Sequence, residues 1–242
     1  MTTARQHLVR TAARNNAEWC AAMSRSHGVE SEFGTRVWHA PVRTPLFHPD
    51  AVTLAPNTAP ATVAEGVDAT TPGASVKDSF ADVDLSALGY RILFEAQWVY
   101  RPAGGSADTG DRAWEVVESP AQLRAWADTW DQGEGHADVF RPELLDDPAT
   151  FVLAERSSDG RTAAGAVATV SEGAVGISNV FAVEGGPDAA WPFVLTAVHG
   201  LFPALPLVGY EHGEALSAAL RHGFEPIGPL RIWLHDQHPA GR

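Results

Sequence analysis

Residues 177–188 read ISNVFAVEGGPD, and residues 222–224 read HGF. The first stretch continues an apolar run that starts at Ala174 and then meets two glycines and a proline, which is typical of a strand that turns into a helix. The second stretch lies between a helical pattern over Gly213–His222 and an apolar run over Phe224–His235. Both stretches predict that strands and helices alternate in the second half of the chain.

The rest of the second half fits this alternation. Ser119 followed by Pro120 predicts a helix N-cap and first turn, and Ser158–Asp159–Gly160 predicts a hairpin turn. The expected strands are Ala113–Glu118, Thr150–Glu155, Thr162–Val170, Ala174–Val183, Pro206–Tyr210 and Phe224–His235, and the expected helices are Ala121–Trp130, Arg141–Leu145, Pro187–Leu201 and Gly213–His222. The predicted order is therefore β–α–(α)–β–β–β–α–β–α–β.

The first half is less regular. Thr2–His27 predicts a helix, because apolar residues recur on one face and a glycine follows. Tyr90–Tyr100 predicts a strand rich in aromatic and aliphatic residues. Asp50–Leu54 predicts a shorter strand, and Ala74–Leu88 predicts a second helix.

The stretch Arg101–Asp111 (RPAGGSADTGD) contains three glycines and no large apolar residue, so it predicts a linker. It divides the chain into a helical and β region at 1–101 and an α/β domain at 112–242. The segments Leu88–Gly89–Tyr90 and His222–Gly223–Phe224 echo each other, since each precedes a strand. Two units of related fold explain this echo, and so does chance, because glycine commonly follows a helix.

Composition narrows the class of protein. The 242 residues carry a net charge of −13: residues 1–101 hold 9 basic and 10 acidic side chains, and residues 102–242 hold 8 and 20. This balance argues against nucleic-acid binding, which needs a basic face. A single cysteine, Cys20, the absence of a signal-peptide pattern, and the lack of an apolar run of roughly 18 residues predict a cytoplasmic protein that does not enter membranes. The histidines lack metal-ligand spacing, so we expect no metal.

The predicted order of elements resembles the N-acetyltransferase (GNAT) superfamily. His222–Gly223–Phe224 resembles the Gly-Phe that closes this family before its final strands. Ile177–Val183 followed by Glu184–Gly185–Gly186 resembles the family's fourth strand and phosphate-binding loop. The whole chain resembles divergent two-part actinobacterial members. The resemblance implies an α/β (α+β) fold with a mixed, mostly antiparallel central sheet flanked by helices, and an additional N-terminal α/β region that one interpretation makes a degenerate second GNAT-like unit.

The resemblance also implies a donor site for acyl-CoA or acyl-phosphopantetheine, with binding residues Ser178, Asn179, Val180, Phe181, Gly185 and Gly186. Loop amides at a helix N-terminus would hold the pyrophosphate. Three features depart from the family: Pro187 removes an N–H donor, Glu184 and Asp188 add negative charge, and Ala219 stands where the family often has a tyrosine acid. An acyl carrier protein would need no pyrophosphate site, so both donors stay open, and Asp188 could instead cap the helix.

The catalytic candidates are Glu211 and His212, which end the fifth strand of the predicted domain. Either side chain could accept a proton from an attacking amine; alternatively, both are solvated loop residues. Two asparagines inside a helix have poor propensity and suggest a further role, and aromatic, histidine-bearing loops often border clefts. The acceptor-site candidates are Asn15, Asn16, Trp19, Trp38, His48 and Tyr210.

These expectations lead to one functional hypothesis and one alternative. The hypothesis is an acyltransferase of secondary metabolism that moves an acyl group from a coenzyme A or carrier-protein thioester to an amine or hydroxyl of a small molecule. The alternative is a non-catalytic GNAT-like module that binds a ligand or protein. A monomer and a homodimer are both compatible with the sequence.

Overall fold

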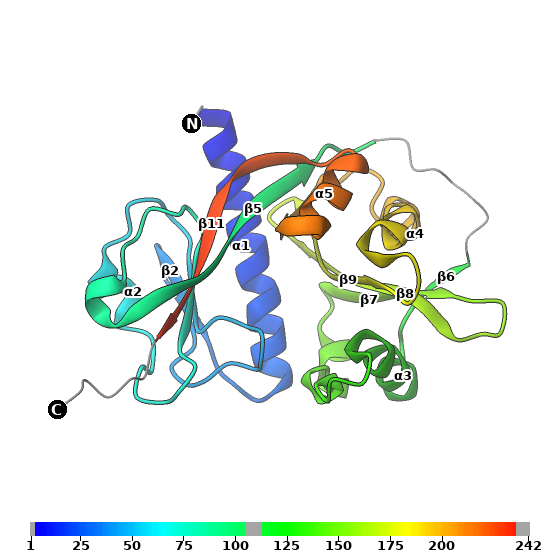
Figure 1. Cartoon of the computed structure of the whole chain (residues 1–242), viewed down its shortest axis with the longest axis horizontal. Coiled ribbons are helices and arrows are strands. Elements are labelled where there is room, and N and C mark those ends of the chain that lie inside the picture. Colours follow the sequence, from blue (N-terminus) through cyan, green and yellow to red (C-terminus); the bar gives the residue numbers. More distant parts are fainter. Residues whose placement is uncertain (1–2, 105–112, 236–242) are drawn as a thin grey trace.

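The computed structural model describes residues 3–104 and 113–235. Its strands form one mixed sheet in the order β1-β2-β3-β4-β11-β5-β10-β9-β8-β7-β6 (Figure 1). Among the described strands, only β3–β4 and β9–β10 pair in parallel. The strands are β1 (Glu32–Phe33), β2 (Val37–His39), β3 (Ala51–Thr53), β4 (Ser75–Asp78), β5 (Tyr90–Arg101), β6 (Trp114–Val116), β7 (Thr150–Arg156), β8 (Thr162–Ser171), β9 (Ala174–Ala182), β10 (Leu207–Glu211) and β11 (Glu225–His235). This arrangement confirms the predicted mixed, mostly antiparallel sheet.

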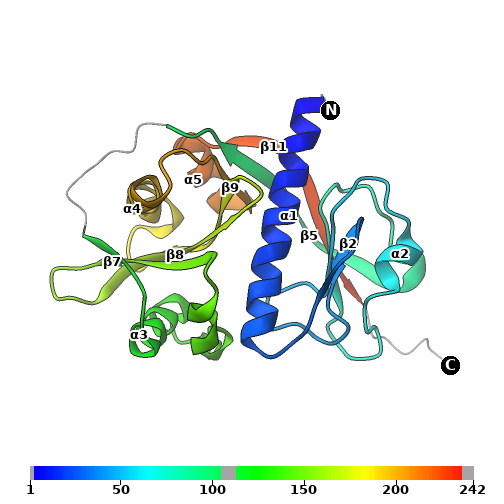
Figure 2. The same cartoon turned by 180° about the vertical axis from the view of Figure 1, so that it is seen from behind.

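Helices cover both faces of the sheet (Figures 1 and 2). They are α1 (Thr3–Ser26), α2 (Pro60–Ala64), α3 (Pro120–Asp131), α4 (Gly186–Leu201) and α5 (Gly213–Arg221), with short 3₁₀ helices at Ser86–Leu88, Ala137–Val139 and Pro142–Asp146. Helices α4 and α5 lie on one face of the C-terminal strands, and α1 and α3 lie on the other. In the described ranges, no helix combines the length and apolar character that crossing a bilayer requires.

Strands from the two parts of the chain interleave at the centre of the sheet. The long strand β5 lies between β10 and β11, and β11 in turn lies between β5 and β4. The β5–β11 ladder runs from Tyr100↔Glu225 to Tyr90↔His235. Residues 105–111 of the predicted linker lie outside the described residues, and the division at 101/112 stays a prediction.

Helix α1 crosses the sheet and contacts strands of both parts. Its 24 residues span about 36 Å at 1.5 Å per residue. Four buried alanines, Ala12, Ala13, Ala17 and Ala21, are at most 1% exposed, so the helix backbone can approach the strands closely. The predicted helix Thr2–His27 is confirmed with almost the same bounds.

The predicted helix at Ala74–Leu88 is wrong. Residues Ser75–Asp78 form β4, which pairs with β11 on one side and β3 on the other. The buried Asp78 carboxylate then accepts hydrogen bonds from the amides of Phe80 and Val83, at 3.3 and 3.0 Å, and shapes the turn that follows. Long-range strand pairing thus overrides the local helical pattern.

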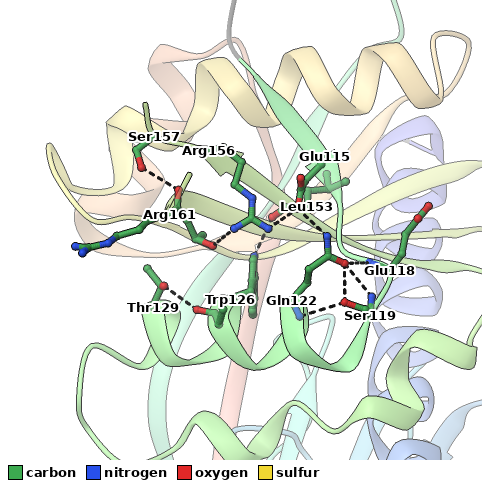
Figure 3. A network of polar contacts seen from close by, with 12 residues as sticks. Glu115, Glu118, Ser119, Gln122, Trp126, Thr129, Leu153, Arg156, Ser157 and Arg161 are labelled. Atoms are coloured by element: carbon green, nitrogen blue, oxygen red, sulfur yellow. Dashed lines mark hydrogen bonds and ion pairs between the residues drawn. The ribbon is translucent and has the colours of Figure 1, made fainter. Parts of the chain in front are cut away.

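A polar network fixes α3 against the C-terminal strands (Figure 3). Ser119 and Gln122 form a capping box at the start of the helix. Gln122 Nε2 also donates to Glu115 Oε1 at 3.2 Å, and Arg156 pairs with the same carboxylate. Trp126 Nε1 donates to the carbonyl of Leu153 at 2.9 Å, so the helix is joined to both β6 and β7.

Asn15 joins α1 to the turn between β8 and β9. Its Nδ2 lies 3.0 Å from the carbonyl oxygen of Thr169 and 3.4 Å from those of Ser171 and Ala174. A Cβ at Gly176 would lie 1.8 Å from Asn15 Oδ1, so only glycine fits beneath this asparagine. The position of Asn15 therefore requires a glycine at residue 176 of β9.

We predict that Gly176→Ala lowers the free energy of unfolding by roughly 1–3 kcal/mol, because the added methyl group overpacks the contact. Chemical denaturation of wild type, Gly176→Ala, Asn15→Ala and the double variant forms a double-mutant cycle. The alanine at 176 should cost less when Asn15 is already alanine. Strictly additive effects in the cycle would contradict the proposed contact.

Candidate active site

The parallel strands β9 and β10 diverge after a short ladder. Their register includes only Leu207↔Val175 and Val208↔Gly176. Beyond these pairs, β10 continues to Glu211 along β5, whereas β9 continues along β8. The divergence opens a gap in the sheet at the C-terminal ends of β9 and β10.

A bulge in β9 lies beside this gap. The register with β8 shifts between Gly165↔Phe181 and Val167↔Ser178, so two residues of β9, Asn179 and Val180, oppose one residue of β8. Asn179 has a φ of +53°, in the left-handed region. The bulge leaves one residue of β9 without a ladder partner on β8, next to the point where β10 has moved away.

The gap holds a cavity of about 300 Å³, which we name the splay cavity. Its walls come from α1, β4, β5, β9, β10 and the loop before β3. It brings together nine predicted site residues that come from four separate stretches of sequence. The lining residues are Asn16, Trp19, Cys20, Phe47, His48, Pro49, Lys77, Phe94, Ile177, Ser178, Asn179, Val180, Tyr210, Glu211 and His212.

Glu211 is the acidic residue of this wall. It lies half-buried at the end of β10. Burial disfavours the charged carboxylate and raises the pKa of Glu211 from 4.5 to about 7. Such a side chain exchanges a proton readily near neutral pH, which is what a general base requires.

Two histidines border the same cavity. His212 is exposed, and the centroid of its ring lies 5.0 Å from the centroid of the Phe94 ring. His48 contacts the indole of Trp19 edge-on at 5.6 Å, and its Nδ1 lies 2.9 Å from the carbonyl of Leu46. Burial lowers the pKa of His48 to about 4, so this ring is neutral at pH 7, with Nδ1–H donating to the carbonyl.

Lys77 was not among the predicted site residues. It is the single lysine of the chain and is only 2% exposed, in β4. Its Nζ donates to Asn16 Oδ1 at 2.5 Å and lies 4.1 Å from the centroid of the Tyr210 ring. The lone lysine among arginines was the available signal, but the stretch around it was assigned to a helix.

A second cavity of about 590 Å³ adjoins the first, and we name it the apolar cavity. The two cavities share Phe47, His48, Pro49, Lys77, Phe94 and Tyr210. Its further walls include aliphatic side chains from the loop before β3 and from β5 and β11, together with polar side chains near the start of β3 and β4. The aliphatic residues are Leu46, Leu93, Ile232 and Leu234, and the polar residues are Arg43, Thr44, Asp50 and Ser75. None of the predicted donor-binding residues lines it.

Three predicted site residues within strands or helices have other contacts. Asn15 binds the β8–β9 turn. Trp38 is fully buried in β2, where it packs with α1 residues and lies 6.3 Å from Phe33. Phe181 is 7% exposed and packs edge-on against Trp126 of α3. These side chains stabilise the fold and do not line either cavity.

The predicted phosphate loop lies at the start of α4, and its residues Glu184–Asp188 line neither cavity. Gly185 is the N-cap residue with a φ of +80°, and Gly186 is also exposed. Asp188 makes no capping hydrogen bond; its Oδ1 instead lies 3.0 Å from Arg221 Nη2 and 3.2 Å from His222 Nε2. The negative charge of Asp188 is therefore balanced by the end of α5.

Two further residues bear on the chemistry. Ala219 is fully buried in the core between α5 and the sheet and carries no proton donor. Cys20 is 1% exposed, and burial raises the pKa of its thiol above 9.0, so it behaves as a small buried side chain rather than a nucleophile. Within residues 3–104 and 113–235, no three His, Cys, Asp or Glu side chains are grouped as metal ligands.

The raised pKa of Glu211 predicts a pH-dependent stability. The folded pKa exceeds the unfolded value, so its stabilising contribution is present below pH 4.5 and is lost as pH rises through about 7. Glu211→Gln, which cannot ionise, should gain stability relative to wild type over this range, by at most about 3 kcal/mol. Thermal melts across this range test this, with Glu214→Gln at an exposed position of α5 as control. A Glu211→Gln difference that does not change with pH contradicts the assignment.

Comparison with known proteins shows which fold this is. No protein-family model and no curated protein sequence matches the chain. Among solved structures, a GCN5-related N-acetyltransferase from Kribbella flavida matches with a TM-score of 0.59 and 16% identity, covering 94% of this chain and 96% of that one. A structure from Novosphingobium aromaticivorans, described as a putative GNAT-family acetyltransferase, matches with a TM-score of 0.55 and 12% identity, covering 90% and 96%.

A conserved protein of unknown function from Staphylococcus epidermidis has the same TM-score of 0.55 at 12% identity, over 69% of this chain and 74% of that one. The two N-acetyltransferase matches cover at least nine-tenths of both chains, so the likeness is not confined to the C-terminal half. The chain therefore has the fold of the GNAT N-acetyltransferases, as the sequence resemblance predicted.

Proposed function

We propose that this protein is an acyltransferase that moves an acyl group from a phosphopantetheine thioester to an amine or hydroxyl group of a small molecule. The observation that carries the proposal is Glu211, a carboxyl with a pKa of about 7, at the open end of β10 in the splay cavity. The GNAT fold supports the same reaction class, but a fold alone does not determine an activity.

The residues of the splay cavity would divide the reaction between two walls. The acyl thioester would lie along β9, with its carbonyl oxygen at the backbone amides near the bulge, where Val180 lines the cavity. The acceptor nitrogen would attack the carbonyl carbon while Glu211, directly or through water, takes its proton. The carbon–sulfur bond then breaks, and the thiolate leaves with the pantetheine arm. His212 is the second candidate base.

Two acyl donors are compatible with the proposed reaction, acyl-CoA and an acyl group bound to a carrier protein. Gly185 and Gly186 place backbone N–H groups at the positive end of α4, which favours a phosphate. Asp188, whose charge argued against free coenzyme A, is paired with Arg221 and His222. Pro187 and the exposed Glu184 still weaken such a site. We therefore propose acyl-CoA as donor, with a carrier-bound acyl group of secondary metabolism as the second candidate.

Acyl transfer is tested by incubating the protein with acetyl-CoA and a panel of small amines and measuring the free thiol released. Wild type should release thiol in an amine-dependent way, with a rate that rises as pH increases through about 7. Glu211→Gln should lower turnover on the order of 10²-fold. His212→Ala is measured in parallel, and unchanged turnover in both variants contradicts the assignment of the base.

The donor is tested by comparing acetyl-CoA with acetyl-pantetheine in thermal melts. Both carry the same thioester arm, but only acetyl-CoA carries the pyrophosphate. We expect a larger rise in melting temperature with millimolar acetyl-CoA, because a ligand that binds the folded state stabilises it. Equal shifts favour carrier delivery. A shift without any thiol release favours the alternative of a non-catalytic binding module.

A further inference from the structure

Lys77 is a buried cation with incomplete partners. An ammonium group has three N–H donors. In the described part of the chain, Lys77 Nζ has one hydrogen-bond acceptor, Asn16 Oδ1 at 2.5 Å, and one aromatic face, the ring of Tyr210. At 2% exposure its charge is almost entirely removed from bulk water, although the residue lines both cavities.

No described carboxylate forms an ion pair with Lys77. Arg43 also lines the apolar cavity, but unlike Lys77 it has a counter-ion, the buried carboxylate of Asp50. The Asp50 oxygens also accept hydrogen bonds from the backbone amides of Thr44 and Ser75. A buried charge is costly unless it is paired. Lys77 therefore has the environment of a cation whose counter-charge arrives with a ligand.

We infer that Lys77 binds the carboxylate of the acceptor, and that the acceptor is an apolar α-amino acid or a close analogue. The carboxylate would accept a hydrogen bond from an N–H of Lys77 that does not bind Asn16, at the boundary between the two cavities. The amine would extend into the splay cavity toward Glu211. This inference rests on the proposed function only for acylation of the amine, because the carboxylate can bind to Lys77 whether or not an acyl group is transferred.

The position of Lys77 favours the acceptor over the acyl donor as the source of the anion. Ser178, Asn179 and Val180, on the proposed donor wall, line the splay cavity but not the apolar cavity. Lys77 lies on β4, in the N-terminal part of the sheet, and lines both. A ligand that reaches Lys77 from the side away from β9 is therefore the acceptor.

The apolar character of the ligand follows from the walls beyond Lys77. The apolar cavity of about 590 Å³ continues from Lys77 between Leu46, Leu93, Phe94, Ile232 and Leu234. An aliphatic or aromatic side chain entering this space would be removed from water against side chains of the same kind. The three recognition elements thus correspond to the amine, carboxylate and side chain of one apolar amino acid.

The test compares leucine with leucinamide, which differ in the carboxylate, and repeats the pair for phenylalanine. Binding is measured by calorimetry without donor, and acetylation is measured with acetyl-CoA. We expect wild type to bind each amino acid roughly 10- to 100-fold more tightly than its amide, which is the range for a hydrogen bond to a charged group. Lys77→Met, which keeps the apolar stem, should abolish this preference and leave amide binding within a few-fold of wild type.

Two controls keep the result interpretable. Lys77→Met should melt at or above the temperature of unliganded wild type, because it removes an unpaired buried charge. Leu93→Ala, at a 47% exposed position of the apolar cavity, should weaken the amino acid and its amide equally. Equal binding of acid and amide by wild type, no binding of either, or an equal loss in Lys77→Met overturns the inference.

The binding and transfer assays separate the two proposals. Carboxylate-dependent binding without acetylation contradicts the proposed function but leaves the Lys77 site standing. Acetylation of an amino acid and its amide at equal rates supports the proposed function but contradicts the Lys77 site.

Discussion

The pairing of β5 with β11 is the interaction on which the rest of the structure depends. β5 lies near the middle of the chain and β11 near its C-terminal end, and the two strands run antiparallel through almost their whole length. Through its other edge β5 joins β10, and through its other edge β11 joins β4. Without this ladder, β1–β4 with β11 would form one sheet and β5–β10 another, and β4 would have no place beside the gap between β9 and β10.

The ladder also explains why distant residues meet at the cavities. Lys77, Ile232 and Phe94 lie in register across β4, β11 and β5. Helix α1 crosses the same strands, so Asn16 can accept a hydrogen bond from Lys77 while Asn15 holds the β8–β9 turn. Two asparagines that weaken a helix locally are thus retained because each satisfies a polar group of the sheet.

The candidate chemistry arises where this regular pairing stops. A sheet with complete ladders would leave no space for a ligand and no free backbone donors. The bulge at Asn179 and the short ladder between β9 and β10 interrupt the hydrogen bonding at one edge of the gap. Glu211 ends β10 at this point, where partial burial rather than a charged neighbour raises its pKa. The site where the strands diverge therefore both opens the cavity and holds the candidate base whose pKa is raised.

The sequence by itself determined the elements whose signals are local: α1, the N-cap and first turn of α3, the hairpin of β7 and β8, and the GNAT-like order of the second half. It also indicated Glu211 at a strand end, Asn16 at a poor helical position, and His48 in an aromatic loop. Only the tertiary structure decided that residues 75–78 form a strand, since four residues acquire that conformation from β3 and β11. The burial of Lys77, and the placement of Trp38 and Phe181 in the core instead of the site, likewise depend on partners far away in sequence, which no local pattern contains.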